Sequence, residues 1–216
     1  MIIAIDGLAA SGKGTIARLL AKHFNYAHLD TGLLYRAVGA AVLAVHGDPS
    51  DPILAARAAE MLDPTAVCAI KHDDFLRTAA VGSAASVVAA MPDVRAFLFD
   101  FQRNFCAKPP DGKAGAVLDG RDIGTIIAPD AKVKIFVTAR PEIRATRRAK
   151  ELRARGENVT DAAVLADMQA RDARDQNRGV APTHPASDAR LLDTSELSVD
   201  QSLAHALAIV QEAMLN

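Results

Sequence analysis

A loop of small residues surrounds a single lysine near the start of the chain. The apolar run IIAI (2–5) leads through Asp6 into GLAASGKGT (7–15), and a helix-forming pattern follows. Glycines let successive backbone N–H groups turn toward one point, and the N-terminus of the next helix adds unpaired donors. Lys13 supplies a charge for β- and γ-phosphates, and Thr15 supplies a hydroxyl for Mg²⁺. The predicted phosphate site consists of Gly7, Leu8, Ala9, Ala10, Ser11, Gly12, Lys13, Gly14 and Thr15.

The alternative for this segment is a glycine-rich turn that binds nothing. The preceding strand, the following helix and the position of the lysine favour a phosphate site, with ATP and Mg²⁺ as the expected ligands. Gly14 separates Lys13 from the hydroxyl residue. The resulting order GKGT is usual in kinases that phosphorylate nucleoside monophosphates.

The segment DTGLLYR (30–36) follows a second short strand, at the edge where open α/β sheets bind ligands. Arg36 can pair with a phosphate in bidentate geometry, and Tyr35 can pack on a base. The alternative is a capped helix start with Asp30 or Thr31 as the N-cap. Both interpretations can hold, because capping leaves Tyr35 and Arg36 free.

The segment LDGRDIGT (118–125) brings a carboxylate and an Arg–Asp pair to the same edge. Asp119 can orient water on Mg²⁺, and Asp122 can accept hydrogen bonds from a base amino group or a sugar hydroxyl. The alternative is a structural ion pair between Arg121 and Asp122 within a turn. These residues alone leave both interpretations open.

The segment RDARDQNR (171–178) gathers arginines on one predicted helix. Arg171, Arg174 and Arg178 are spaced i, i+3 and i+7 and are expected to share a face, with Asp175 beside them. Phosphoryl transfer needs positive charge on the phosphate oxygens and exclusion of water, which a hinged arginine-bearing segment supplies. We therefore predict an arginine-rich lid over residues 141–178. The alternative is a surface helix laced with salt bridges.

Composition limits the classes of function. The chain has 216 residues, half of them hydrophobic, which suits a single α/β domain over 1–216 with a sizeable core. A formal net charge of −1 and only 4% aromatic residues argue against a nucleic-acid role. Cys68 and Cys106 lack ligand spacing, and the six histidines form no metal pattern. No signal peptide or long apolar segment is evident, so we expect a cytoplasmic protein with no membrane role.

The elements that must position these residues alternate along the chain. This alternation predicts an α/β fold with a parallel sheet covered by helices on both faces. Residues 48–113 interrupt the rhythm with mostly helical patterns and one strand-like run, Ala66 to Lys71, and are interpreted as an insert. Residues 179–188 form a Pro-rich connector. The predicted strands are 2–5, 27–30, 114–119, 132–137 and 189–194, and the predicted helices are 13–24, 32–46, 141–155, 161–178 and 198–215.

The motifs GLAASGKGT, DTGLLYR, GRDIGT and RDARDQNR, in this order and at these separations, resemble those of a bacterial-type cytidylate kinase. The resemblance runs from Ile3 to the C-terminal helix, and residues 84–95 resemble the family's pyrimidine monophosphate segment. It implies a P-loop NTPase fold in which 48–113 is an acceptor-binding insert. It also implies γ-phosphoryl transfer from ATP to CMP or dCMP.

The resemblance further implies roles for individual residues. Arg36 and Arg121 match phosphate-binding arginines, and Asp175 matches a ribose contact. The expected substrate-binding residues are Thr31, Tyr35, Arg36, Ser86, Arg95, Arg121, Asp122, Asp175 and Arg178. The expected catalytic residues are Lys13, Arg121, Arg171, Arg174 and Arg178. The expected metal contact is Thr15, with Asp119 acting through water. The family usually carries a small β-sheet arm where this chain has a short insert at about 63–75, and by resemblance the short insert suggests a monomer.

Two other functions compete with this interpretation. A small-molecule P-loop kinase of the shikimate or dephospho-coenzyme A type would not need the 30–36 cluster or the pyrimidine segment. A nucleotide-dependent switch generally needs a base-specific loop, and the sequence shows no such signature. A nucleoside monophosphate kinase accounts for all four motifs.

Overall fold

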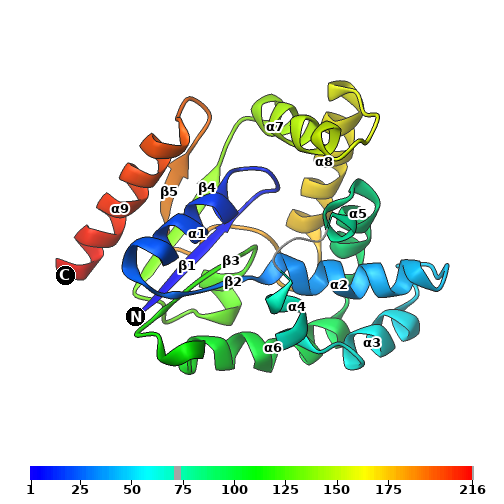
Figure 1. Ribbon diagram of the computed structural model, residues 1–216, viewed down its shortest axis with the longest axis horizontal. Helices are drawn as coiled ribbons and strands as arrows, with labels where there is room; N and C mark the ends of the chain where they lie inside the picture. The colour runs from blue at the N-terminus through cyan, green and yellow to red at the C-terminus, as the bar shows by residue number, and fades with distance from the viewer. Residues whose placement is uncertain (71–73, 216) are drawn as a thin grey trace.

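Five parallel strands form the centre of the fold (Figure 1). The computed structural model describes residues 1–70 and 74–215. The strands run in the order β2-β3-β1-β4-β5, and each adjacent pair is parallel. They are β1 (Ile2–Gly7), β2 (Ala27–Asp30), β3 (Ala116–Gly120), β4 (Val133–Thr138) and β5 (Arg190–Asp193). All five strands predicted from apolar runs, and the parallel sheet, are therefore confirmed.

The strand register gathers acidic side chains at one edge of the sheet. Asp30 at the end of β2 lies opposite Asp119 in β3, and Asp6 in β1 lies opposite Gly120. The carboxyl ends of parallel strands meet at one edge, so the segments that follow β1, β2 and β3 open onto the same space. The phosphate loop lies at this edge.

Alternation along the strands divides their side chains between two cores. The flanking helices are α1 (Lys13–Phe24), α2 (Thr31–Ala44) and α9 (Val199–Leu215). Ile3 and Ile5 of β1 pack with residues of α1 and α9 on one face. Ala4, between them, packs with Leu118 and Ile127 on the other face. This period of two is expected of strands buried on both sides.

The described residues of the segment interpreted as an insert are mostly helical and form a layer beside the sheet (Figure 1). Its elements are α3 (Pro52–Glu60), α4 (Pro64–Ala69), η1 (Phe75–Arg77), α5 (Ala79–Val88), α6 (Pro92–Ala107) and η2 (Pro110–Gly112). Leu34 and Val38 of α2 pack with Val88 and Leu98 of the insert in a separate core. The insert is therefore anchored on α2, the helix that begins with the DTGLLYR segment.

The strand predicted over Ala66 to Lys71 is wrong. Residues 66–69 lie in helix α4, and Lys71 lies outside the described residues. The side chain of Asp63 accepts hydrogen bonds from the backbone N–H groups of Thr65 (2.9 Å) and Ala66 (3.2 Å), and Pro64 follows it in the first turn. This N-cap begins a helix despite the strand-like composition of the following residues.

Two further helices, α7 (Pro141–Ala154) and α8 (Asp161–Asn177), form a hairpin at the top of Figure 1, above α5. Leu152 and Met168 lie in the apolar core of this hairpin, and Ala9 of the phosphate loop packs against it. The predicted helix end at 178 is one residue too far, because Arg178 has extended backbone angles. Arg178 therefore does not continue the helical face of Arg171.

Helix length and apolar content bear on the membrane expectation. In residues 1–70 and 74–215, no single helix is long and apolar enough to span a membrane. One pair, Ala79–Val88 and Pro92–Gly112, meets the criteria of length and composition together but is bent by 96°.

Candidate active site

The loop after β1 has the backbone geometry of a phosphate cradle. Gly7 has φ +148° and Gly12 has φ +91°, conformations that side chains rarely adopt. Gly12 is the N-cap of α1 and supplies no side-chain cap, so side-chain capping does not occupy the N–H groups of the first turn. The Ser11 Oγ is buried and has no hydrogen-bond partner in the described structure. The loop therefore fits an anion that would accept from these donors.

Gly7→Ala tests the geometry of the cradle. A Cβ at Gly7 would lie 2.0 Å from the carbonyl oxygen of Val137, so the substitution is expected to lower the free energy of unfolding by about 3 kcal/mol or to prevent folding. Gly179→Ala is the matched control, because nothing lies within 4 Å of its added Cβ, and its stability should change by less than about 0.5 kcal/mol. Urea unfolding of both variants measures the difference; equal stabilities would show that the loop tolerates a side chain at Gly7.

Lys13 lies in the first turn of α1, and among the described residues no carboxylate forms an ion pair with it. Its Nζ donates to the carbonyl oxygen of Leu8 at 3.3 Å, within the loop itself. Burial, with a further contribution from nearby Arg121, lowers the pKa of Lys13 to about 7. A bound phosphate would supply the negative charge that the lysine lacks.

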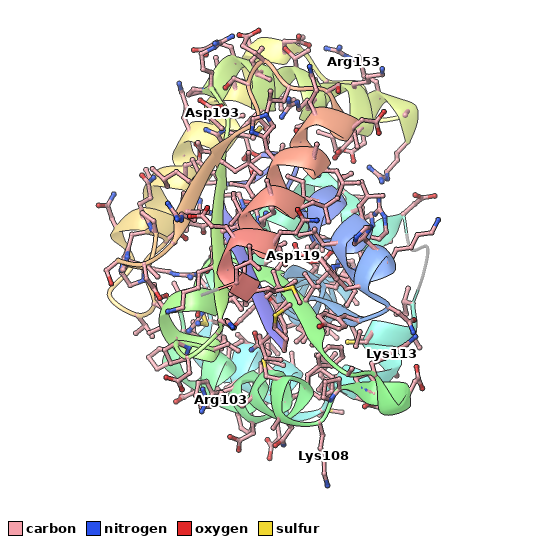
Figure 2. The ribbon with its side chains drawn as sticks, turned by 90° about the vertical axis from the view of Figure 1, so that its left-hand side faces the viewer. Arg103, Lys108, Lys113, Asp119, Arg153 and Asp193 are labelled. Carbon is pink, nitrogen blue, oxygen red and sulfur yellow. The ribbon has the colours of Figure 1, made fainter. Side chains whose placement is uncertain are left out.

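Asp119 places a carboxylate beside the start of α1. Figure 2 shows it inside the outline of the molecule, while Lys108 projects from the periphery, and only 3% of Asp119 is exposed. A Cβ on Gly14 would lie 3.5 Å from its Oδ1, so that oxygen faces the loop that carries Thr15. Burial, and then Asp119, raises the pKa of Asp30 across the strand register. Two close carboxylates of this kind fit a site that receives a cation.

The donor set fits Mg²⁺ bound together with phosphates. In the described part of the chain, no three His, Cys, Asp or Glu side chains cluster as a metal cage. Mg²⁺ typically takes one or two protein oxygens, several waters and substrate phosphate oxygens. The Thr15 hydroxyl and the Asp119 carboxylate are the protein groups that would hold it, as the sequence predicts.

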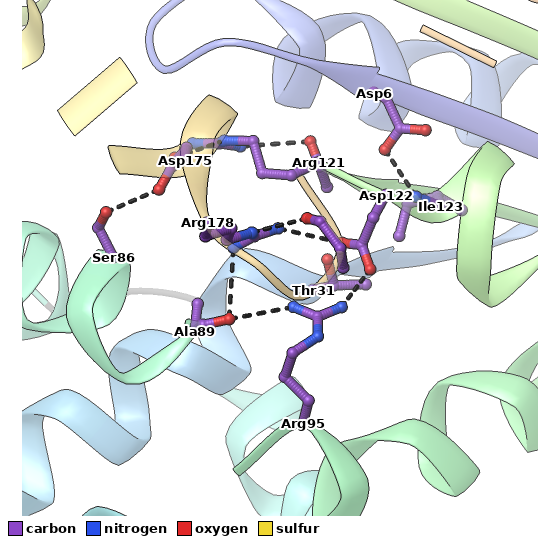
Figure 3. A network of polar contacts seen from close by, with 12 residues as sticks. Asp6, Thr31, Ser86, Ala89, Arg95, Arg121, Asp122, Ile123, Asp175 and Arg178 are labelled. Carbon is purple, nitrogen blue, oxygen red and sulfur yellow. Dashed lines mark hydrogen bonds and ion pairs between the residues drawn. The ribbon is translucent and has the colours of Figure 1, made fainter. Parts of the chain in front are cut away.

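Asp6 organises the turn after β3, a role that the sequence analysis missed. Its carboxylate accepts hydrogen bonds from the N–H groups of Ile123 (2.8 Å) and Gly124 (2.7 Å), the first of them drawn in Figure 3. Burial raises the pKa of Asp6 to about 6 against the opposing effect of these bonds. The turn is the π-helix η3 (Ile123–Ile127). An aspartate at the end of an apolar strand was the available signal, because a buried carboxylate needs donors.

A pocket lies where α2, α5, α6 and α8 converge, and two of its arginines, Arg121 and Arg171, are close enough to Lys13 of the phosphate loop to lower its pKa. It contains Ser86 and Arg95 of the insert, far in sequence from the loop. The complete lining is Thr31, Gly32, Tyr35, Ala85, Ser86, Ala89, Arg95, Gly120, Arg121, Asp122, Arg171, Asp175 and Arg178. The structure thus brings together eight of the nine residues predicted to bind the substrate; the ninth, Arg36, does not line this pocket.

Asp122 is the centre of one ion-pair cluster in this pocket. Its carboxylate pairs with Arg95, and its Oδ1 lies 3.9 Å from Nη2 of Arg178. Both guanidiniums also donate to the carbonyl oxygen of Ala89, at 3.3 and 3.4 Å (Figure 3). Nη2 of Arg178 is buried and has no hydrogen-bond partner in the described structure. Nη2 of Arg178 is therefore available to donate a hydrogen bond to a bound ligand.

Asp175 is the centre of the second cluster. It accepts from Oγ of Ser86 at 2.7 Å and from Nε of Arg121 at 3.3 Å (Figure 3). Nε of Arg171 lies 3.9 Å from its Oδ2. Although burial acts to raise it, Arg121 and Arg171 hold the pKa of Asp175 below its usual value. Asp175 is therefore ionised at neutral pH and aligns groups from three elements.

These pairings decide between two interpretations left open by the sequence. Arg121 pairs with Asp175 rather than with its neighbour Asp122, so the local ion pair of a turn does not form. Thr31 is the first residue of α2, and its hydroxyl donates to the carbonyl oxygen of Asp119 at 2.9 Å. Asp30 occupies the N-cap position, but its side chain makes no capping hydrogen bond. The cluster at 30–36 is therefore tied to β3 rather than to its own helix start.

Three predicted residues occupy positions that the sequence did not indicate. Tyr35 lies under the guanidinium of Arg95, 5.6 Å from ring centroid to Cζ, in a cation–π contact. Arg36 donates to the carbonyl oxygen of Leu76 at 2.7 Å and lies close to Arg171 across Gly82. Burial, and then Arg171, lowers the pKa of Arg36 to about 9. Arg174 does not line the pocket, and its buried Nη1 has no partner in the described structure.

The α7–α8 hairpin is tied to the phosphate loop by Arg144, which the sequence analysis did not single out. Arg144 donates to the carbonyl oxygens of Ala139 (2.9 Å) and Ala9 (3.3 Å) and pairs with Asp172 at 2.7 Å. The alternative of a salt-bridged surface helix holds only for outward-facing pairs such as Arg153 with Asp161. The hairpin therefore presents charge both to solvent and to the loop.

The pocket has a surplus of positive charge. Its lining carries four guanidinium groups and two carboxylates, which leaves an excess of two positive charges beside the phosphate loop.

A phosphate loop between the first strand and first helix of a parallel sheet, facing such a pocket, is the arrangement of a P-loop kinase. The family model for cytidylate kinase matches residues 3–212. The chain belongs to the cytidylate kinase family.

Individual relatives agree with this assignment. The cytidylate kinase of Azorhizobium caulinodans is 59% identical over 213 residues, which cover 99% of both chains. That of Rhodospirillum rubrum is 56% identical over 210 residues, or 97% of both. A solved structure of an uncharacterized protein from Eubacterium ventriosum has a TM-score of 0.56 at 16% identity, covering 100% of this chain and 99% of that chain, a likeness of fold alone. The family resemblance of the four motifs is confirmed, and the chain is a kinase with nucleotide substrates.

Proposed function

We propose that this kinase transfers the γ-phosphoryl group of ATP to CMP or dCMP, giving CDP or dCDP and ADP. The observation that carries the proposal is the excess of two positive charges in the pocket beside the phosphate loop. A phosphate monoester carries a charge of about −2 at neutral pH, because its second pKa is about 6. The phosphate of a nucleoside monophosphate therefore matches this surplus, whereas an uncharged acceptor would leave the arginines unbalanced.

The chemical step needs no protein nucleophile. An oxygen of the acceptor phosphate attacks the γ-phosphorus, the bond from that phosphorus to the β,γ-bridging oxygen breaks, and ADP leaves. Lys13 and Arg171 stabilise charge on the phosphate oxygens, and Arg174 joins them when the hairpin closes and excludes water. Mg²⁺, when bound through Thr15 and water held by Asp119, neutralises further charge.

The base and sugar are held by the insert and by α8. Ser86, Arg95 and Asp122 supply donors and acceptors for cytosine, and Asp175 accepts from the ribose. Arg121 and Arg178 position the acceptor phosphate from the pocket lining, which Thr31 and Tyr35 complete. Arg36 would act on the same phosphate from outside that lining. Buried polar groups of this kind discriminate strongly, because a wrong base leaves them unpaired.

An acceptor panel tests the proposal. ADP release is measured with ATP and Mg²⁺ and with CMP, dCMP, UMP, AMP, GMP, shikimate or dephospho-coenzyme A at one concentration. CMP and dCMP are expected to accelerate release most. If no acceptor raises the rate above that with ATP alone, the proposal fails and a slow nucleotide switch becomes the better interpretation.

The proposal extends to the setting of the enzyme. We infer a monomer that acts in the cytoplasm on small-molecule nucleotides, with neither a nucleic acid nor a membrane as partner. The residues that line the pocket all belong to one chain, so acceptor binding calls for no residue of a second copy. Gel filtration with light scattering tests this, and a dimer at enzyme-assay concentrations would contradict it.

A further inference from the structure

One contact at the edge of the phosphate site has no role in the function proposed above. Nε2 of His28 lies 2.8 Å from Oδ2 of Asp119. His28 belongs to β2, and in the sheet register it lies opposite Val117, while Asp30 lies opposite Asp119. Val117 packs on the face covered by α1, so His28 and Asp119 share that face. The contact joins two neighbouring strands directly beneath the start of α1.

The contact gives the two oxygens of Asp119 different surroundings. An ionised carboxylate can only accept hydrogen bonds, so Nε2 of His28 donates and Oδ2 is occupied. Oδ1 is the oxygen nearest Gly14, next to Thr15. Torsion about the last bond of an aspartate is broad, and a fixed partner on one oxygen selects the orientation of the other.

The surroundings of Asp119 make this selection necessary. Asp119 lies close enough to Lys13 and to Asp30 to affect the pKa of each. Lys13 and Asp30 also affect the pKa of one another. Attraction by Lys13 and repulsion by Asp30 would otherwise set the orientation of the carboxylate. His28 has a side chain that is 26% exposed, whereas that of Asp119 is 4% exposed, so it holds the buried group from the solvent side.

We propose that His28 is a positioning residue for phosphoryl transfer: it holds Oδ2 of Asp119 so that Oδ1 faces the divalent cation of the bound nucleotide. The proposal rests on the function proposed above, in which Asp119 holds water on that cation. Mutation of a residue that hydrogen-bonds a metal ligand, without touching the metal itself, commonly lowers metal affinity by about 10- to 100-fold. Because Asp119 itself acts through water, the lower end of this range is expected.

Two substitutions separate positioning from packing. His28→Leu keeps apolar bulk but removes the donor, and His28→Gln keeps an N–H donor at about the reach of Nε2. Binding of Mn²⁺ to the enzyme with the non-hydrolysable analogue β,γ-imido-ATP is followed by electron paramagnetic resonance. His28→Leu is expected to weaken Mn²⁺ binding about 10-fold and His28→Gln to restore most of it. In kinetics, the Mg²⁺ concentration for half-maximal rate should rise while KM for CMP stays unchanged.

The controls make the result decisive. His205→Leu, at an exposed position of α9, should bind Mn²⁺ as the unsubstituted protein does. If His28→Leu lowers only the Tm and leaves Mn²⁺ affinity unchanged, His28 is structural and the proposal is overturned. Unchanged Mn²⁺ affinity in Asp119→Asn would overturn it as well. Both outcomes leave the kinase assignment intact, which fails only if the unsubstituted protein phosphorylates no acceptor.

Discussion

Lys13→Ala is expected to reduce turnover by roughly 1,000-fold or more, because removal of one preorganised positive group from a phosphoryl-transfer site has effects of that size. Lys13 is the cation of the phosphate loop, and its Nζ donates to the carbonyl oxygen of Leu8. The loop backbone would remain, so nucleotide binding should weaken less than the rate falls. Single-turnover ADP formation with CMP measures the loss.

The same substitution is expected to leave the protein at least as stable. The folded-state pKa of Lys13 is about 7 and lies below the unfolded value of 10.5, so folding disfavours its charged form. Between these two values the unfolded state binds more protons, and stability contributed by this group therefore rises with pH from about 7 to about 10. Below pH 7 the penalty is complete, and above the unfolded pKa it is absent. Removing Lys13 should abolish this contribution.

Urea unfolding at pH 7 and pH 9 tests both the stability expected of Lys13→Ala and its pH dependence. The difference in free energy of unfolding between Lys13→Ala and the unsubstituted protein should shrink as pH rises. Lys22→Ala, exposed in the last turn of α1, is the control for loss of a lysine from this helix. Near-normal turnover in Lys13→Ala would refute the role of the loop in transfer.

The parallel sheet was predictable because its signals are local. IIAI and its four counterparts are apolar runs of strand length, and helical patterns separate them, which leaves a parallel sheet as the simple solution. The phosphate loop was predictable for a similar reason, since strand, loop and helix are contiguous. In contrast, the 66–71 run was mistaken for a strand because the cap formed by Asp63 decides against its composition.

The pairings within the site were not predictable from the sequence. Adjacent Arg121 and Asp122 invited a local ion pair, yet each reaches a partner on another element, Asp175 or Arg95. Only the folded arrangement of the insert against α8 makes those partners available. The helical spacing of 171–178 correctly predicted that Arg171 and Asp175 lie side by side on one helix. The prediction was wrong for Arg178, because helix α8 ends at Asn177.

Asp122→Ala is expected to have the largest effect on stability among the pocket residues. Asp122 pairs with Arg95 and lies 3.9 Å from Arg178, and the three residues are 5%, 8% and 9% exposed. Removing the carboxylate leaves two guanidiniums that share the carbonyl oxygen of Ala89 and have no other ion pair in the described part of the chain, although the charge of Asp175 also reaches Arg178. Breaking a buried pair in this way typically costs about 3–5 kcal/mol. Urea unfolding without nucleotide measures the cost.

A surface pair provides the matched comparison. Glu196 pairs with Arg140, and their side chains are 74% and 55% exposed. Glu196→Ala should therefore change the free energy of unfolding much less than Asp122→Ala does, because solvent screens exposed pairs. Equal costs for Asp122→Ala and Glu196→Ala would contradict the buried network.

The double substitution R95M/D122A separates folding from recognition. Replacing a buried charge pair with apolar groups of similar volume is often neutral, so the double variant should recover most of the stability lost in Asp122→Ala. Its pocket then lacks two groups proposed to recognise cytosine, and KM for CMP should stay at least about 10-fold higher, since an unmade polar contact costs about 1–3 kcal/mol. If stability and KM recover together, neither Arg95 nor Asp122 recognises the base, and the pair serves folding alone. Recovery of stability alone would mean that the Arg95–Asp122 pair also forms part of the surface that selects the base.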